Sequence, residues 1–139
     1  MTLAEIDAEL PNGFHDAEVG RIDIDFRSRV VILELDVWIG DVGMPADAGR
    51  ELYRPARLEV RGFSYFVVER PHSESPYAKP GPLELDFCGP EPIGDLPATR
   101  AGEFAATFFV ADWNSCFSLS AADAELRWTG DAYDRGPDC

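Results

Sequence analysis

The chain has 139 residues, of which 26 are acidic and 12 basic, and its formal net charge at pH 7 is −14. This charge argues against nucleic acid as a partner, because protein affinity for nucleic acid comes largely from cationic contacts to phosphate. Hydrophobic residues make up 45% of the chain, as in a folded globular protein, which argues against the disordered, collagenous and disulfide-rich classes.

The first ten residues have the pattern of a short helix. Thr2 and Glu5 have the spacing of a capping box, and apolar residues recur at helical intervals until Pro11 and Gly13. Acidic residues occupy several of the other positions, so the apolar stripe is narrow. We expect this helix to end before Pro11 and to lie across one opening or edge of a sheet.

Two segments with period-two alternation follow, 22–26 and 31–37, and predict a hairpin that closes around Arg27 and Ser28. Matching their apolar faces sets the register. It places Ile24 opposite Val31, Ile22 opposite Leu33, and Arg21 opposite Glu34. The four apolar residues should be buried. A change of phase upstream predicts a bulge at Gly20.

The middle of the chain alternates between loop and strand patterns. Residues 40–50 have the glycine-rich composition of a long loop. A third strand is predicted over 56–69, with a second bulge at Gly62, where the apolar phase changes. Prolines interrupt strand pairing over 71–82, and a short fourth strand follows over 83–87.

A second hairpin is predicted over 103–121, with its turn at 112–115. Its register sets Val110 against Phe117, Phe108 against Leu119, and Ala106 against Ala121. One further alternating segment, 124–128, predicts a final short strand.

Together these patterns predict an all-β, mainly antiparallel fold. We expect a sandwich or a partly open barrel of six or seven strands, with one short N-terminal helix. The length suits a single domain, which should span residues 1–128. Residues 129–139, rich in Gly, Asp and Pro, should form a C-terminal tail.

The first residues lack the basic and apolar regions of a signal peptide, and no stretch reaches the about 20 apolar residues of a membrane-spanning helix. We therefore expect a cytoplasmic protein that does not associate with membranes. The three widely spaced cysteines predict two reduced thiols in the core, Cys88 and Cys116, and one terminal thiol, Cys139. No motif indicates a cofactor, a metal site or a nucleophile, so none is expected.

His15 and Asp16 form the strongest candidate site, in a turn before the first strand. An imidazole titrates near neutral pH and a neighbouring carboxylate raises its pKa, so the pair could act as a general base. Residues adjacent in sequence rarely face each other, however. In the structural alternative, Asp16 or Asn12 bonds to backbone amides of the turn while His15 packs beside Phe14.

Four carboxylates should share one outward face of the first hairpin: Asp23, Asp25, Glu34 and Asp36. Carboxylates bind divalent cations, but these four lack the spacing and the glycine of a calcium loop. The face is then either simply solvated or the surface that binds a basic partner protein. Together with His15 and Asp16 these four are the candidate binding residues, and no residue is assigned a catalytic role.

Three segments resemble a loose group of small uncharacterised bacterial β-rich proteins: Leu10–Ala17, which contains a Phe-His-Asp-Ala turn, Arg57–Val60, and the turn Asp112–Ser115. Some members of this group are similar to proposed immunity proteins of bacterial toxin systems. The resemblance implies a cytoplasmic protein that binds and neutralises another protein, such as a basic toxin. It implies no catalytic residue.

Two classes of function follow. The first is a non-enzymatic, immunity-like protein that binds a basic partner through an acidic face. The alternative is a small hydrolase or metal-dependent enzyme that uses His15 and Asp16. The enzyme predicts that His15, Asp16 and other carboxylates converge in one pocket, whereas the binding protein predicts an acidic surface without a deep polar cleft.

Overall fold

A computed structural model of the protein describes residues 1–72, 74, 81–91 and 94–136. Helix α1 (Leu3–Glu9) comes first. The strands are β1 (Pro11–Phe14), β2 (Ala17–Asp25), β3 (Val30–Trp38), β4 (Leu52–Arg61), β5 (Tyr65–Val68), β6 (Leu83–Gly89), β7 (Phe104–Val110), β8 (Ser115–Ala121), β9 (Asp123–Trp128) and β10 (Tyr133–Asp134). A π-helical turn spans Ala46–Arg50, and a short 3-10 turn spans Ala111–Trp113. None of the helices described in the structure combines the length and the apolar character needed to cross a membrane.

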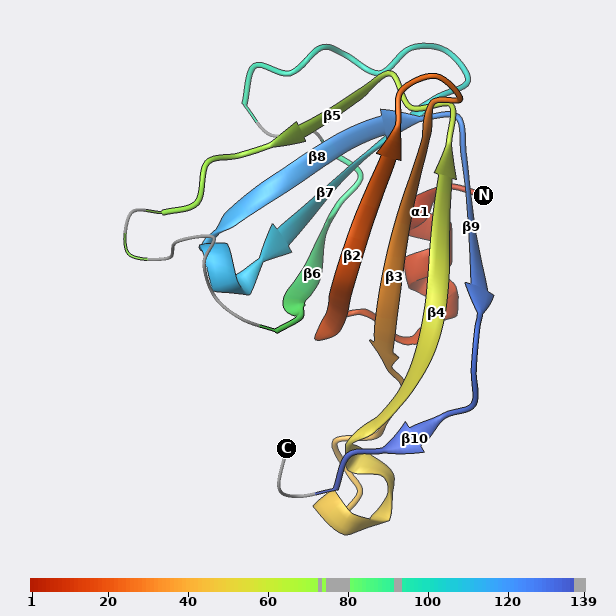
Figure 1. Ribbon diagram of the computed structural model, residues 1–139, viewed down its shortest axis with the longest axis vertical. Helices are drawn as coiled ribbons and strands as arrows, with labels where there is room; N and C mark the ends of the chain where they lie inside the picture. Colours follow the sequence, from red (N-terminus) through yellow and green to blue (C-terminus); the bar gives the residue numbers. More distant parts are fainter. Residues whose placement is uncertain (73, 75–80, 92–93, 137–139) are drawn as a thin grey trace.

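The predicted all-β, antiparallel fold is confirmed. Nine strands form one curved sheet in the order β10-β4-β3-β2-β6-β7-β8-β5, with β9 beside β4. Strands β5 to β8 cross at an angle to β2, β3 and β4 (Figure 1), and the sheet does not close into a barrel. The strands exceed the predicted six or seven because β1 and β10 are additional and the predicted third strand is two strands.

That third strand, predicted over 56–69, divides at Gly62, where we had expected only a bulge. Strand β4 begins four residues earlier, at Leu52, and pairs with β3 and β9, whereas β5 pairs with β8 at the far edge of the sheet. Gly62 has a φ of +66°, and an added Cβ would lie 3.0 Å from the Cβ of Ala122. The chain therefore turns out of one half of the sheet and into the other at this glycine.

The β2–β3 hairpin has the predicted register. Ile24 pairs with Val31, Ile22 with Leu33, and Arg21 with Glu34. Val31 and Leu33 are buried, whereas Ile22 and Ile24 are half-buried and pack against the core. Asp23 and Asp25 are exposed, as expected.

The predicted bulge at Gly20 is also present, and it marks the point where β2 leaves β6. The register of β2 with β3 shifts between Val19 and Arg21, and the described pairing of β2 with β6 covers only Ala17–Val19. A groove of about 310 Å³ opens beyond the bulge, lined in part by Gly20 and Leu83.

The β7–β8 hairpin has the predicted apolar face but a register shifted by two residues. Val110 pairs with Ser115 instead of Phe117, and Phe108 pairs with Phe117. The cause is a tighter turn, because Asn114 adopts the left-handed conformation (φ +47°) directly after the 3-10 turn. A shift by two keeps every side chain on its original face.

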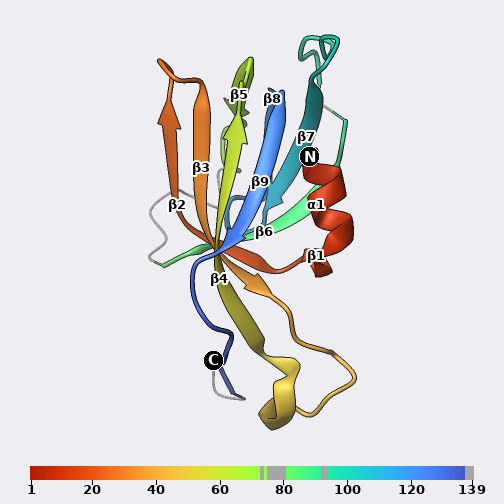
Figure 2. The ribbon, with the colours of Figure 1, turned by 90° about the vertical axis from the view of Figure 1, so that its right-hand side faces the viewer.

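The core lies between the two halves of the sheet and α1. The expected core thiols are not part of it, because Cys88 is exposed and Cys116 is only half-buried. Phe14 packs edge-on against Phe108 (5.4 Å between ring centroids), and Phe108 stacks on Phe117 (5.1 Å). Helix α1 begins with the predicted capping box and contacts β7 and β9, which belong to opposite halves of the sheet (Figure 2). It buries Leu3 and Ile6 and thus covers an opening of the sheet, as predicted.

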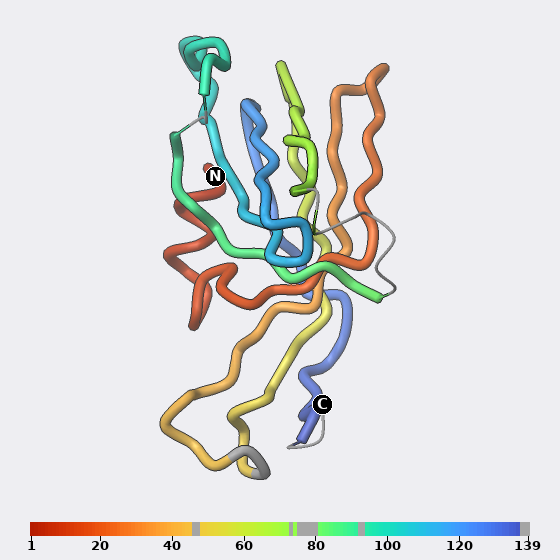
Figure 3. Tube along the Cα trace, turned by 90° about the vertical axis from the view of Figure 1, so that its left-hand side faces the viewer, coloured from red at the N-terminus to blue at the C-terminus, as the bar shows by residue number. Residues whose placement is uncertain are grey.

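The start of β4 projects below the rest of the sheet, and the C-terminal segment lies beside it (Figure 3). The described part of the expected tail therefore contains a strand, β10, whose Tyr133 pairs with Tyr53 and whose Asp134 pairs with Leu52. This arrangement brings β10 to the same end of the molecule as the start of β2, which follows the turn at His15 (Figure 1).

Candidate functional site

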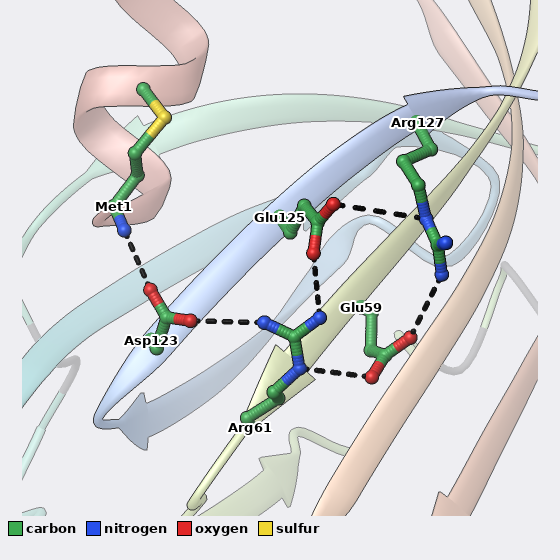
Figure 4. Close-up of polar contacts among 6 residues, drawn as sticks. All are labelled: Met1, Glu59, Arg61, Asp123, Glu125 and Arg127. Carbon is green, nitrogen blue, oxygen red and sulfur yellow. Dashed lines mark hydrogen bonds and ion pairs between the residues drawn. The ribbon is translucent and has the colours of Figure 1, made fainter.

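The outer face of β4 and β9 carries a network of ion pairs (Figure 4). The guanidinium of Arg61 lies 2.6 Å from Glu125, 3.0 Å from Asp123 and 3.0 Å from Glu59. The N-terminal amine of Met1 lies 2.6 Å from Asp123. Arg127 joins the network through Glu59, at 3.5 Å. Acidic and basic side chains therefore largely compensate each other on this face.

Three of the predicted binding carboxylates lie on the same compensated face. Asp23 forms an ion pair with Arg21 (2.9 Å). Asp25 accepts hydrogen bonds from the backbone N–H groups of Ser28 and Arg27, and these bonds lower its pKa. Glu34 lies between arginines in the register of the sheet. We conclude that these carboxylates carry little uncompensated charge.

The fourth predicted carboxylate, Asp36, belongs to a different group at the lower end of the sheet. Asp36 lies directly opposite Glu18 across β3 and β2, and Glu18 lies directly opposite Glu84 across β2 and β6. Like charges opposite each other on neighbouring strands destabilise a sheet. Further carboxylates adjoin this row. We call the whole group the acidic cluster: Asp16, Glu18, Asp36, Glu84, Asp86 and Asp112.

His15 lies at one side of the acidic cluster. Its Nδ1 is 2.5 Å from Oδ1 of Asp86, and its Nε2 is 3.4 Å from Oδ2 of Asp16. The hydrogen bond with Asp86, together with the charge of Asp16, raises the pKa of His15. The side chain is 61% exposed, so the imidazole is accessible to a ligand.

His15 and Asp16 face each other, contrary to our expectation for adjacent residues, because Asp16 adopts a left-handed conformation (φ +56°). The expected contacts of the turn also differ. Asn12 donates its side-chain N–H to the carbonyl of Gly40 (2.8 Å), and His15 lies edge-on to Trp38 instead of packing beside Phe14. The turn is thus fixed by contacts that leave His15 directed toward the carboxylates.

Glu84 lies at the centre of the cluster. Its carboxyl group hydrogen-bonds to that of Asp16, and this bond, with partial burial and the nearby charges of Asp86 and Asp112, raises the pKa of Glu84 to about 7. Its backbone N–H donates to Oδ2 of Asp112 (2.9 Å). Glu84 therefore keeps a proton up to near neutral pH, because its ionised form would be repelled by the neighbouring carboxylates.

Arg135 compensates the other side of the cluster. Its guanidinium lies 2.6 and 2.9 Å from the two carboxylate oxygens of Glu18, and 3.8 Å from Asp36. It also stacks on the ring of Tyr53, 3.7 Å from the centroid. Burial raises the pKa of this tyrosine to about 12, so its ring carries no charge near neutral pH.

One set of ligands could hold a divalent metal ion. One potential ligand atom from each of His15, Asp16 and Asp86 lies within 4.8 Å of the others. An imidazole nitrogen with two carboxylate oxygens suits first-row divalent metals.

The comparisons with known proteins give no information on the function. No family model, curated protein or solved structure matches the chain. The function is therefore inferred from the geometry of the acidic cluster.

The structure thus brings together three of the six predicted binding residues, His15, Asp16 and Asp36, and places the other three on the compensated face. Sequence reasoning missed Glu18, Glu84, Asp86, Asp112 and Arg135. The outward alternation of Glu84 and Asp86 on the fourth strand was visible in the sequence, but nothing there placed that strand beside β2.

Proposed function

We propose that the protein is a non-enzymatic binding protein that takes up a cationic group of a basic partner protein at the acidic cluster. The observation that carries this proposal is the cross-strand row of Asp36, Glu18 and Glu84. A row of like charges weakens strand pairing unless a cation lies over it. Departures from local design rules of this kind are typical of functional sites.

The positions of the chain's own cations beside the cluster also support the proposal. Among the residues that the structure describes, two cations lie beside the cluster, His15 and Arg135, at its opposite sides. Glu84, between them, keeps a proton near neutral pH. A cation of the partner placed beside Glu84 would favour its ionised form, so binding should release a proton.

An immunity-like role is consistent with this chemistry. The resemblance implies a protein that neutralises another protein, and an acidic site suits a basic toxin. A field of one sign also accelerates encounter with a partner of the opposite sign. The groove of about 310 Å³ beyond Gly20 lies beside Leu83, the residue before Glu84, and offers apolar surface next to the charges.

Binding of a hexaarginine peptide tests this proposal. Fluorescence anisotropy of a labelled peptide at low salt should show that the double variant Glu84→Gln/Asp86→Asn binds about tenfold more weakly than the wild-type protein, a difference of roughly 1.4 kcal/mol. The matched control, Asp23→Asn/Asp25→Asn, removes the same formal charge from the compensated face and should change the affinity less than twofold. Equal losses in the two variants would show that net charge alone drives binding and would overturn the proposal.

A second function, a metal-dependent enzyme that uses His15 and Asp16, is favoured by one observation, the three potential ligand atoms within 4.8 Å of one another. Glu84 would then be suited to general acid–base chemistry, since its pKa of about 7 matches neutral pH. Trp38 lies 6.1 Å from the His15 ring and reports on that site.

Titration with Mn²⁺ or Zn²⁺ separates the two functions. The enzyme predicts stoichiometric quenching of tryptophan fluorescence that Asp86→Asn abolishes and Asp23→Asn leaves unchanged. Under our primary proposal, these metals associate only weakly with the acidic cluster and give no stoichiometric quenching.

A further inference from the structure

We propose that Glu18, Asp36 and Tyr53 form a site for an arginine side chain of the partner, and that the chain's own Arg135 occupies this site as a displaceable substitute. The segment Tyr133–Arg135 would then act as a strap over the site. This inference rests on the proposed function, because it names the chemical group that the acidic cluster recognises and the segment that competes for it.

The contacts of Arg135 define the ligand chemistry. One guanidinium nitrogen, Nη1, donates to both carboxylate oxygens of Glu18, the other, Nη2, lies 3.8 Å from Asp36, and the group stacks on Tyr53. A planar guanidinium reaches two carboxylates through separate nitrogens while it stacks on an aromatic ring, which the single nitrogen of an ammonium ion does less well. The site therefore favours arginine over lysine.

Among the described residues, the strap pairs with the sheet over a short stretch of backbone. Strand β10 pairs with β4 through two residues, whereas β9 pairs with the same strand over six. Tyr133 and Asp134 are exposed, and Tyr133 is 40% exposed. The backbone N–H of Arg135 adds a hydrogen bond to the carbonyl of Glu51 (2.9 Å). Short strands with exposed hydrogen bonds are the first segments of a fold to open.

Displacement of the strap would expose two complementary features. The edge of β4 at Leu52 and Tyr53 would present free backbone groups, and the carboxylates of Glu18 and Asp36 would lose their cation. The edge at Leu52 and Tyr53 belongs to the projecting start of β4, beside which β10 runs (Figures 1 and 2), and Arg135 links this segment to Glu18 of β2 and Asp36 of β3. An extended segment of the partner that contains an arginine could pair with this edge and place its guanidinium in the site, as β10 does now.

A peptide copied from the chain tests this inference. Its sequence is that of residues 131–136, Asp-Ala-Tyr-Asp-Arg-Gly, with both ends blocked. A short linked segment has an effective concentration in the millimolar range, so the strap of the wild-type protein should compete strongly with the free peptide. In full-length Arg135→Ala the site is vacated, and we expect the peptide to bind at least about tenfold more tightly, measured by NMR shifts of the Glu18 and Tyr53 amides.

Two controls show whether the guanidinium is recognised. A peptide with lysine in place of arginine should bind Arg135→Ala several-fold more weakly, and Arg135→Ala/Glu18→Gln should lose peptide binding. If Arg135→Ala proves unstable, Tyr133→Ala loosens the strap while keeping Arg135, and it should also increase peptide affinity over the wild type.

Absence of shifts in folded Arg135→Ala at about 10 mM peptide, well above the effective concentration of the strap, would overturn the inference. Equal affinity for the wild type and for Arg135→Ala would do the same. If this experiment fails while Glu84→Gln/Asp86→Asn still weakens hexaarginine binding, the strap is purely structural and the proposed function stands. If the peptide binds Arg135→Ala but Glu84→Gln/Asp86→Asn has no effect on hexaarginine, the proposed function fails instead.

Discussion

Two residues, Glu84 within the acidic cluster and His15 beside it, hold their protons more tightly in the folded protein than in an unfolded chain. The pKa of His15 is raised chiefly by its hydrogen bond to Asp86, and the pKa of Glu84 is raised to about 7 by its hydrogen bond to Asp16. Between pH 4.5 and pH 7 the folded state therefore binds more protons at Glu84 than the unfolded state does. The same holds for His15 between pH 6.5 and its raised pKa. In both windows, stability falls as the pH rises.

The midpoint of thermal unfolding should consequently be lower at pH 8 than at pH 5. We expect a difference of about 2–4 °C, corresponding to roughly 1 kcal/mol after allowance for the solvent screening of these exposed groups. Glu84→Gln cannot lose a proton and should remove most of the fall between pH 5 and pH 7, as measured by circular dichroism. A midpoint that rises steadily from pH 5 to pH 8 in the wild type would contradict the raised pKa of Glu84.

At the scale of the elements, local patterns were enough to predict the first hairpin. The alternation of Ile22 and Ile24 with acidic residues matches that of the following strand in one register only, and a slip of one residue would bury a carboxylate. The β7–β8 hairpin was predicted with the correct face but the wrong register. The left-handed conformation of Asn114 tightens its turn, and the two registers bury the same residues.

The sequence patterns did not predict the pairing between strands that lie far apart in the sequence. Alternation indicates which side chains face a core, but not which strands pair with each other. Neither the pairing of β5 with β8 nor that of β10 with β4 was therefore predicted. The candidate site was found only in part for the same reason. His15 and Asp16 were visible as a local motif, whereas Glu84 and Asp86 reach them through the pairing of β6 with β2. Arg135 lay in a segment with the composition of a tail.

On the scale of the whole molecule, the net charge of −14 is unevenly compensated. The outer face of β4 and β9 interleaves arginines with carboxylates, while the lower end gathers the acidic cluster around His15 and Arg135. Salt changes the stability contributed by these two regions in opposite directions. It weakens the ion pairs of Arg61, which are partly exposed, and it screens the repulsion among the carboxylates.

Screening of the repulsion among the carboxylates should have the larger effect on stability. Exposed ion pairs contribute about 0–1 kcal/mol each, whereas the excess negative charge destabilises the compact state as a whole. We therefore expect the unfolding midpoint at pH 8 to rise by a few degrees as NaCl increases from about 10 mM to about 1 M, over which the Debye length falls from about 30 Å to about 3 Å. Differential scanning calorimetry measures this change. The variant Glu84→Gln/Asp86→Asn removes two charges of the cluster and should reduce the rise, whereas Asp23→Asn/Asp25→Asn, on the compensated face, should preserve most of it. A midpoint that falls with salt would mean that the ion pairs of Arg61 stabilise the fold more than repulsion within the cluster destabilises it. The acidic cluster would then lack the uncompensated charge on which binding of a basic partner depends.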